Sequence, residues 1–160
     1  MESTVECIRK YRSSDLEILK QITMICFEEV SIDKNIQDRV GVIAGLDWKQ
    51  RKAFHIDEDV AQDAQGVFVA ESQQEIAGYI TTKTNDQTRI GDIPNLAVLP
   101  RFRRQGIARR LVLVALEHLK IKGMLYTRIA TLDQNAIGAN FYPQEGFVEV
   151  ARQIHYLRPL

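Results

Sequence analysis

The sequence predicts an α/β fold in which a mixed β-sheet carries helices on both faces. Three observations predict it. Apolar residues at helical spacing give way to strand-like runs from Gly66 onward, an apolar strand leads directly into a long helix near residue 105, and strands and helices alternate from there. The expected order is β-α-α-β-β-β-α-β-α-β, with one more strand if the last one is kinked. Since a domain has about 100–200 residues and no linker-like tract interrupts the chain, we expect residues 1–160 to form a single domain.

The first 65 residues predict one strand followed by helices. Val5–Tyr11 has the composition of a short strand, and Ser13–Asp15 offers N-cap side chains for the helix that follows. Apolar residues then recur at helical spacing up to about Glu29. A second helix is expected from about Asp33 to Ile43, and the stretch from there to Gln65 has mixed character.

The middle of the chain predicts three strands. The apolar runs Val67–Ala70 and Ile76–Ile80 flank the turn Ser72–Glu75, which is typical of a hairpin. A third strand is expected over Arg89–Leu99. Pro94 lies inside it, and proline, which cannot donate to a neighbouring strand, is normally confined to edge strands or bulges. Because the flanking residues are strongly apolar, we expect a bulge in an interior strand rather than an edge strand.

The last third alternates between helices and strands. A long helix is expected over Gln105–Lys122, closed by Gly123 in a C-terminal stop position. Strand Leu125–Leu132 and helix Asn135–Gln144 follow. Phe147–Leu157 is expected to form one long strand or a kinked pair of strands.

Charge balance argues against partners that are bound through a positive field. The chain has 21 Lys and Arg against 21 Asp and Glu, whereas binding to nucleic acid or a membrane surface needs a net positive field. The N-terminus lacks the basic and apolar segments of a signal peptide, and the longest aliphatic run, Leu111–Leu116, is far shorter than the ~20 residues of a membrane span. We expect no nucleic acid and no membrane as partners, a cytoplasmic location, and reduced, buried thiols at Cys7 and Cys26.

An arginine-rich turn before the long helix carries the most chemical information. Its arginines are Arg101, Arg103, Arg104, Arg109 and Arg110. A helix N-terminus offers unpaired N–H groups and partial positive charge, and Gly106 has no Cβ to block an anion. These features predict a diphosphate site. The alternative is a solvated basic helix start, and the spacing matches neither a P-loop nor a dinucleotide-binding fingerprint.

Two motifs in this frame resemble the GCN5-related N-acetyltransferases (GNAT). Arg103–Ala108 matches the family pattern Gln/Arg-x-x-Gly-x-Gly/Ala at the start of a helix. Asn135, Gly138, Tyr142 and Gly146–Phe147 match a second family element in type and spacing. The resemblance is clearest from Ala70 to Tyr156 and implies a GNAT-like fold and an acetyl-CoA-dependent N-acetyltransferase.

The resemblance also implies which residues bind acetyl-CoA, the acyl donor. A strand with a bulge would pair with the pantetheine arm, the turn would take the diphosphate, and an asparagine would contact the donor from the far side of the cleft. On this sequence those residues are Leu96, Ala97 and Val98; Arg103, Arg104, Gln105, Gly106, Ile107, Ala108 and Arg109; and Asn135.

The same resemblance places the catalytic groups. A backbone N–H near Val98 would polarise the thioester carbonyl, and Tyr142 would protonate the leaving thiolate. Asp92 matches the carboxylate of the histone-modifying branch and would accept the amine proton. Packing against the sheet is the alternative for Tyr142, and a solvent-facing turn role is the alternative for Asp92. The branch that acetylates a ribosomal-protein N-terminal alanine has a glutamate where this chain has Ala130, which argues against that branch.

Several features stay open at this level. His55, His118 and His155 are scattered, so no metal site is expected. The acidic residues Asp57–Asp63 either attract a cationic acceptor or form a solvated loop. The acceptor is an amine of a small molecule or a peptide, of unspecified identity, and acyl groups other than acetyl also stay open. Family members are often homodimers, which the sequence leaves undecided here. The alternative function is a non-catalytic acyl-CoA-binding regulatory module.

Overall fold

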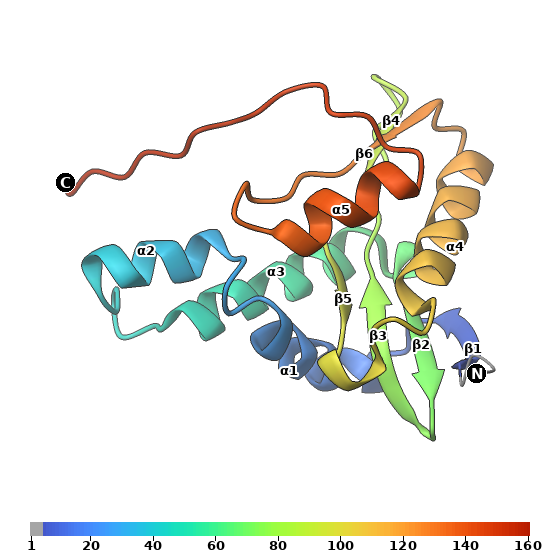
Figure 1. The fold of residues 1–160 in the computed structure, drawn as a ribbon, viewed down its shortest axis with the longest axis horizontal. Helices are drawn as coiled ribbons and strands as arrows, with labels where there is room; N and C mark the ends of the chain where they lie inside the picture. The colour runs from blue at the N-terminus through green and yellow to red at the C-terminus, as the bar shows by residue number, and fades with distance from the viewer. Residues whose placement is uncertain (1–4) are drawn as a thin grey trace.

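The six strands form two separate sheets in the computed structural model, which describes residues 5–160 (Figure 1). The strands are β1 (Val5–Lys10), β2 (Phe68–Ser72), β3 (Glu75–Ile80), β4 (Ile90–Asp92), β5 (Leu96–Val98) and β6 (Tyr126–Arg128). One sheet is antiparallel and has the order β1-β2-β3-β5. The other pairs β4 with β6 in parallel.

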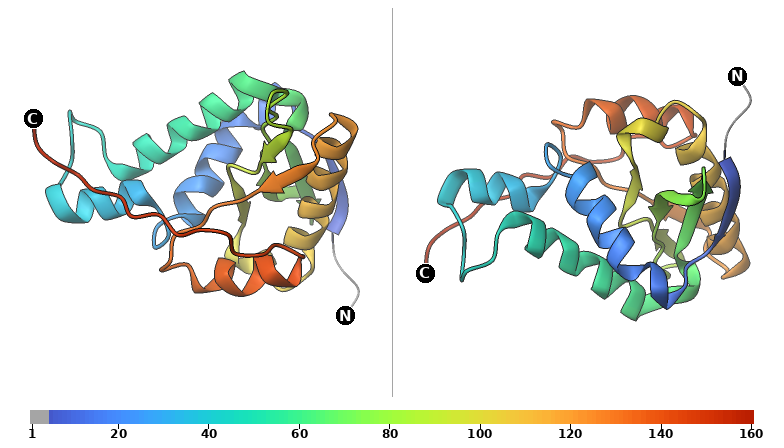
Figure 2. Two further views of the ribbon diagram at one scale, coloured as in Figure 1. Left: turned by 90° about the horizontal axis from the view of Figure 1, so that it is seen from above. Right: turned by 90° about the horizontal axis from the view of Figure 1, so that it is seen from below.

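Helices cover both faces of the four-stranded sheet. They are α1 (Leu16–Cys26), α2 (Ile32–Val40), α3 (Trp48–Asp63), α4 (Ile107–Ile121) and α5 (Ala136–Gln144), with 3-10 turns η1 (Ser13–Asp15), η2 (Ala64–Gly66) and η3 (Pro100–Phe102). Figures 1 and 2 show α1 and α3 on one side of this sheet and α4 on the other. The predicted α/β class, with parallel and antiparallel strands and helices on both faces, is confirmed.

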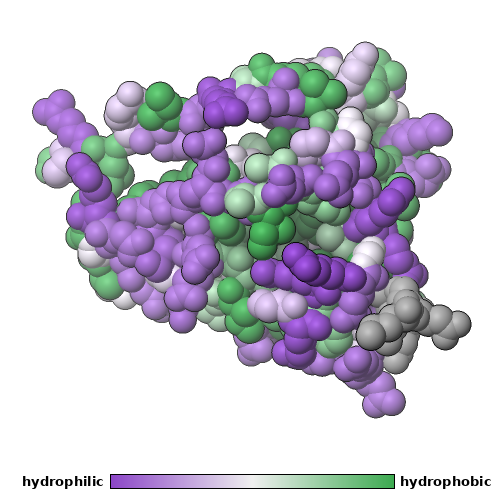
Figure 3. Space-filling model, viewed as in Figure 1, coloured by the Kyte–Doolittle hydropathy of each residue, from purple (hydrophilic) through white to green (hydrophobic). Residues whose placement is uncertain are grey.

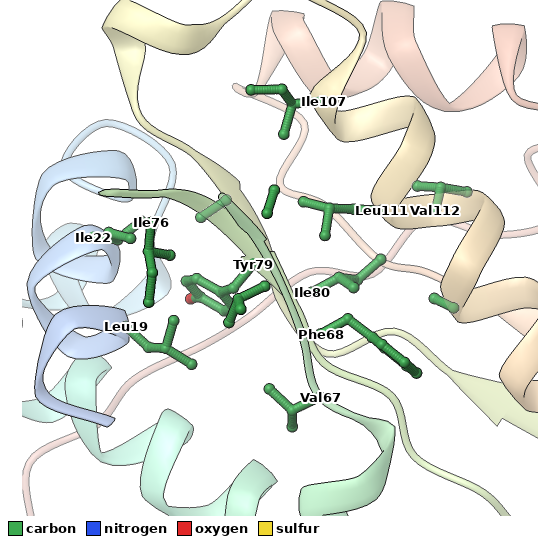
Figure 4. Packing of buried hydrophobic residues seen from close by; sticks show 14 of the residues in the cluster. Leu19, Ile22, Val67, Phe68, Ile76, Tyr79, Ile80, Ile107, Leu111 and Val112 are labelled. Atoms are coloured by element: carbon green, nitrogen blue, oxygen red, sulfur yellow. The ribbon is translucent and has the colours of Figure 1, made fainter. Parts of the chain in front are cut away.

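The core lies between the helices and the sheet because successive side chains of a strand point to opposite faces. Tyr79 and Ile80 of β3 are both fully buried; Figure 4 shows Tyr79 on the side of Leu19 from α1 and Ile80 on the side of Leu111 from α4. The Tyr79 hydroxyl shares a 2.7 Å hydrogen bond with Thr23 Oγ1, so its polar end is satisfied inside the core. Each large buried side chain contributes about 1.5–3 kcal/mol relative to an exposed one.

The predicted strand Arg89–Leu99 is interrupted where Pro94 predicted a bulge. Residues 93–95 separate β4 from β5, and the two halves belong to different sheets. The irregularity predicted at Pro94 is present, since the strand is broken there. The expectation of an interior strand is wrong for its second half, because β5 is an edge strand of the four-stranded sheet.

The region between residues 32 and 63 is more helical than the sequence predicts. The predicted helix Asp33–Ile43 ends earlier, at Val40, because Gly41 adopts a left-handed φ of 81°. The stretch of mixed character is the regular helix α3, which begins with a capping box in which the Asp47 carboxylate accepts from Gln50 N–H at 2.8 Å. The solvated acidic loop expected at Asp57–Asp63 is wrong, since these residues are the last two turns of α3.

The first helix is also capped differently from the prediction. Asp15 does not cap α1 with its side chain; its carboxylate accepts instead from Arg12 N–H at 2.8 Å and pairs with Arg9 at 2.8 Å. Ser13 and Ser14 form the 3-10 turn η1 with it. The turn thus joins the end of β1 to the start of α1.

The C-terminal prediction is wrong. Residues 147–157 form no strand, and the strand predicted over Leu125–Leu132 is reduced to β6. Val148 and Val150 are 82% and 88% exposed. A strand needs a neighbour for its backbone N–H and C=O groups, and no strand within residues 5–160 lies beside this segment to supply one. Within the same residues, no helix is both long and apolar enough to cross a lipid bilayer.

Candidate functional site

Strand β5 has an open edge, which is the first component of the site. Its hydrogen bonds to β3 include Thr81 N–H to Asn95 C=O and Leu99 N–H to Ala77 C=O, both 2.9 Å. In an antiparallel pair, alternate residues face the partner. The backbone groups of Leu96 and Val98 therefore face away from β3, while those of Ala97 are committed to it.

The Val98 carbonyl on this edge is already occupied. It accepts from Arg103 Nε at 3.0 Å and from Cys26 Sγ at 3.4 Å. The groups of the edge that remain directed outward are the N–H of Leu96, the C=O of Leu96 and the N–H of Val98. An extended chain of amides could add to such an edge as a further strand.

The turn from η3 into α4 is the second component. Arg104 and Gly106 both adopt left-handed φ angles, 61° and 78°. A Cβ placed on Gly106 would meet no atom within 4 Å, so this side of the turn is open. A non-glycine residue held in this conformation, as Arg104 is, is more frequent at ligand-binding turns than elsewhere.

The first turn of α4 leaves its backbone donors available. Arg110 N–H is the first of the helix to donate, to Gly106 C=O at 3.1 Å, so the N–H groups of Ile107, Ala108 and Arg109 have no intrahelical acceptor. The Ile107 side chain is buried in the core, and this anchors the turn against the sheet. Gln105 braces the turn by donating from Nε2 to Arg101 C=O at 3.3 Å.

The arginines of the cluster lie in different surroundings and have different partners. Arg101 pairs with Glu75 at the β2–β3 turn and lies over the Phe102 ring at 5.0 Å, and it lines a separate hollow of about 420 Å³ beside α1. Arg103 lies against β5 through Val98, and Arg109 reaches Glu145 Oε2 at 3.7 Å. Positive charge at the turn therefore comes from only part of the cluster.

Helix α5 is the third component, and the Arg109–Glu145 pair ties its C-terminal end to the first turn of α4. Tyr142 lies three residues before Glu145 and shares its face of α5. The Tyr142 ring contacts the rings of Phe141 and Phe147 edge-to-face, with ring centroids 5.3 and 5.8 Å apart. Burial raises the pKa of Tyr142 to about 12, so the hydroxyl is protonated at neutral pH.

Asn135 has a structural role at the other end of α5. Its Oδ1 accepts from Gly138 N–H at 3.0 Å, and its Nδ2 donates to Thr131 Oγ1 at 2.8 Å. The side chain is thus the N-cap of the helix. This capping explains the spacing of Asn135 and Gly138 without a ligand.

Asp92 lies in β4 directly opposite Arg128 of β6. The two form an ion pair with Asp92 Oδ1 and Arg128 Nε 2.7 Å apart. One carboxylate oxygen is therefore taken up by a cross-strand partner, and any further proton acceptor function falls to Oδ2.

A polar cluster under the bulge was not predicted from the sequence. Asn95 is 3% exposed, and its side chain accepts from Lys52 Nζ at 2.8 Å and donates to Asp59 Oδ2 at 2.7 Å. Its backbone N–H donates to Thr81 Oγ1 at 3.0 Å, and Thr81 Oγ1 itself donates to Asp59 at 2.8 Å. This arrangement, the Asn95 clamp, fixes the bulge one residue before the outward-facing N–H of Leu96.

Burial affects both charged members of the Asn95 clamp. It lowers the pKa of Lys52, an effect that Asp33 and Asp59 partly offset, and it raises the pKa of Asp59 against the hydrogen bonds from Asn95 and Thr81. Lys52 Nζ also lies 4.3 Å from the centre of the Phe27 ring. The sequence offers one indication of this cluster. Lys52 and Asp59 are seven residues apart and so share one face of α3, a helix that the sequence did not clearly predict.

Cys26, distant from the motifs in sequence, lies beside β5 in space. Burial raises the pKa of its thiol, although Arg103 opposes this shift. A protonated thiol is a hydrogen-bond donor rather than a nucleophile. Among residues 5–160, no group of three or more His, Cys, Asp and Glu side chains is placed to hold a metal ion.

The open edge of β5 leads through η3 into the first turn of α4, and the Arg109–Glu145 pair joins the end of α5 to that turn. Figure 3 shows apolar side chains exposed at the centre of the face that carries β5, framed by hydrophilic ones. The arrangement offers backbone donors for amides along β5 and for an anion at the turn. It suits an extended ligand that ends in a diphosphate.

Comparison with known sequences supports this interpretation. The model of the acetyltransferase (GNAT) family matches residues 22–147. A mycothiol acetyltransferase of Segniliparus rotundus is 30% identical over 101 residues, 60% of this chain and 38% of the relative. An uncharacterised N-acetyltransferase of Archaeoglobus fulgidus is 38% identical over 64 residues, 37% of this chain and 44% of the relative. The chain thus spans less than half the length of these relatives.

Solved structures share the fold. A crystal structure from Pyrococcus horikoshii has a TM-score of 0.72 at 20% identity, covering 92% of this chain and 91% of that one. The PaiA N-acetyltransferase of Thermoplasma acidophilum in complex with coenzyme A has a TM-score of 0.69 at 20% identity over 86% of each chain. An aminoglycoside N-acetyltransferase in complex with CoA has a TM-score of 0.64 at 18% identity, over 96% and 95% of the chains. Because the family model covers most of the sequence, this chain belongs to the GNAT acetyltransferase family.

Proposed function

We propose that this protein transfers an acetyl group from acetyl-CoA to a primary amine by direct attack within a ternary complex. The observation that carries the proposal is the outward-facing edge of β5 beside the open first turn of α4. Few ligands match both an edge of amide groups and an anion site at a helix N-terminus. Acetyl-CoA combines an amide-bearing arm with a diphosphate.

Different residues bind different parts of acetyl-CoA. The backbone groups of Leu96 and Val98 pair with the amides of the pantetheine arm. The N–H groups of Ile107, Ala108 and Arg109 receive the diphosphate, and the side chains of Arg103 and Arg104 add positive charge. Gln105 and Asn135 are positioning residues. Gln105 stabilises the turn through its hydrogen bond to Arg101 C=O, and Asn135 caps α5.

The proposed chemistry uses the β5 edge together with Tyr142 and Asp92. The amine nitrogen forms a bond to the thioester carbon, the carbon–sulfur bond breaks, and the sulfur leaves as a thiolate. A backbone N–H of the β5 edge, that of Leu96 or Val98, stabilises the negative charge on the carbonyl oxygen. Tyr142 donates its proton to the sulfur, and Asp92 Oδ2, directly or through water, accepts the proton that the amine releases.

A thiol-release assay tests this function. Acetyl-CoA is incubated with the protein and a panel of amines comprising polyamines, amino acids, aminoglycosides and peptides with free N-termini. We expect release of CoA thiol with at least one class of amine and a matching mass increase of that amine. Calorimetric binding of acetyl-CoA without thiol release for any class would favour the non-catalytic acyl-CoA-binding module. Absence of binding would remove both.

Replacing Gly106 by Ala tests the diphosphate site. Gly106 and Gly45 have similar left-handed φ angles, 78° and 75°, and a Cβ at either meets nothing within 4 Å. Both Gly→Ala variants should therefore lose about 1–2 kcal/mol of stability. Only Gly106→Ala places a methyl group where the diphosphate binds, so we expect its affinity for acetyl-CoA to fall at least about tenfold, or 1.4 kcal/mol.

Isothermal calorimetry and thermal unfolding of the two variants separate these effects. The Gly45→Ala variant should bind acetyl-CoA as the unchanged protein does. Equal affinities of Gly106→Ala and Gly45→Ala for acetyl-CoA would show that the diphosphate does not contact this turn.

A further inference from the structure

Lys52 is a buried amine that the proposed mechanism does not use. It is 9% exposed, and no other lysine among residues 5–160 is buried. Within the same residues its Nζ forms no ion pair with a carboxylate and has one hydrogen-bond acceptor, Asn95 Oδ1 at 2.8 Å, although an ammonium group has three N–H donors. Burying an amine with so few partners is costly, and such groups are more frequent at reactive sites than elsewhere.

Two neighbours place the Lys52 amine beside the edge of β5. Asn95, its hydrogen-bond partner, directly precedes Leu96, whose backbone groups face outward from the sheet. Lys52 Nζ also lies 4.3 Å from the centre of the Phe27 ring, and Phe27 follows Cys26, which contacts the same edge. Figures 1 and 2 show why both contacts form, because α1 and α3 lie side by side on this face of the sheet.

The surroundings of Lys52 favour a reactive amine. Burial lowers the pKa of Lys52, an effect that Asp33 and Asp59 partly offset, so the neutral form is more populated than in an exposed lysine. A neutral amine is the form that attacks a thioester. Because the amine is carried on a flexible four-carbon stem, Nζ can leave Asn95 Oδ1 and turn toward the edge without a movement of α3.

We propose that Lys52 is a site of self-acetylation, which accepts the acetyl group of bound acetyl-CoA when no acceptor amine is present. This inference rests on the proposed function, since it uses the same donor on the same strand edge. Lys52 Nζ forms a bond to the thioester carbon, the carbon–sulfur bond breaks, and the proton that Nζ loses ends on the sulfur. The products are a lysine acetylated at Nζ and CoA with a free thiol.

Mass spectrometry of the full chain, incubated with acetyl-CoA and no added amine, tests the site. We expect one added acetyl group, which peptide mapping should place on Lys52. Lys49 is the internal control, because it lies on the same helix and over a ring, that of Trp48 at 5.9 Å, but is exposed. Acetyl-CoA should label Lys52 at least about tenfold more than Lys49, since a bound donor reacts with the amine nearest to it.

Acetyl phosphate provides the comparison for the donor. It has no amide arm to pair with β5, so it should label the exposed Lys49 more than Lys52. An excess of CoA should suppress the labelling of Lys52 by acetyl-CoA, because it occupies the same edge. Equal labelling of the two lysines by acetyl-CoA would overturn the proposal, since it would show acetylation from solution.

Two matched variants check the assignment. Lys52→Arg keeps a donor for Asn95 but replaces the amine by a guanidinium, which stays protonated, so the added acetyl group should be absent. Lys49→Arg should keep it. An unlabelled Lys52 in unchanged protein that acetylates an added amine would overturn self-acetylation and leave the proposed function intact. Absence of thiol release both with and without amines would overturn the two together.

Discussion

Replacing Tyr142 by Phe is expected to lower the turnover number by about a hundredfold or more, the range of a lost general acid. The substitution removes one hydroxyl and keeps the ring, so the edge-to-face contacts with Phe141 and Phe147 persist. Acetyl-CoA affinity and thermal stability should therefore change little. Steady-state kinetics with an amine found in the thiol-release assay measures the effect.

The pH dependence of the same reaction gives a second check on Tyr142. Burial raises the pKa of Tyr142 to about 12. The hydroxyl therefore stays protonated to a higher pH than that of an exposed tyrosine, whose pKa is about 10. No loss of turnover between pH 8 and about 10 should come from this group. Any loss there belongs to another group or to the substrate.

Tyr126→Phe is the matched control, because Tyr126 is 77% exposed on β6 and has no place in the mechanism. Its turnover should equal that of the unchanged protein. If Tyr142→Phe also retains full turnover, Tyr142 is a packing residue only.

Replacing Asn95 by Ala is expected to destabilise the protein by about 3 kcal/mol. The change removes the Asn95 side chain that accepts from Lys52 Nζ at 2.8 Å and donates to Asp59 Oδ2 at 2.7 Å. Asp59 Oδ2 keeps the Thr81 hydroxyl at 2.8 Å, while the buried ammonium of Lys52 loses its Asn95 acceptor. An unsatisfied buried polar group costs about 1–3 kcal/mol, and a charged one more. Because the clamp holds the bulge next to Leu96, turnover should fall along with stability. Urea unfolding measures the first effect and kinetics at low temperature the second.

Asn85→Ala provides the comparison for Asn95. The Asn85 side chain also makes two hydrogen bonds, accepting from Gln87 N–H and Thr88 N–H at 3.1 and 3.0 Å, but it lies in an exposed turn. Its loss should cost about 1 kcal/mol, since water replaces the partners. Equal costs for the two variants would show that the Asn95 clamp does not stabilise the bulge.

Local sequence patterns predicted the structure correctly where it depends on residues that are close together along the chain. Pro94 predicted a bulge at the point where β4 and β5 separate, because proline has no N–H to donate. The start of α4 at Gly106 and its end before Gly123 followed from the left-handed turns that glycine permits. The resemblance to the GNAT family, based on residues 103–108 and 135–147, was confirmed by the family model, which matches residues 22–147.

The sequence failed where a residue depends on a distant partner. Cys26 and Val98 are 72 residues apart, and Lys52 and Asn95 are 43 apart, yet both pairs are in contact. Residues 147–157 have the composition of a strand, but composition cannot supply the neighbour that a strand requires. The separation of Arg101 from the other arginines likewise depends on Glu75, which another turn brings to it.

The sequence by itself thus determined the fold class and the family and located the glycine turn before α4, because turn chemistry and apolar periodicity act between residues close along the chain. The tertiary structure alone decided which backbone groups of β5 face outward and what holds the bulge. These features arise from pairing between segments far apart in the chain, and no local pattern specifies such pairing.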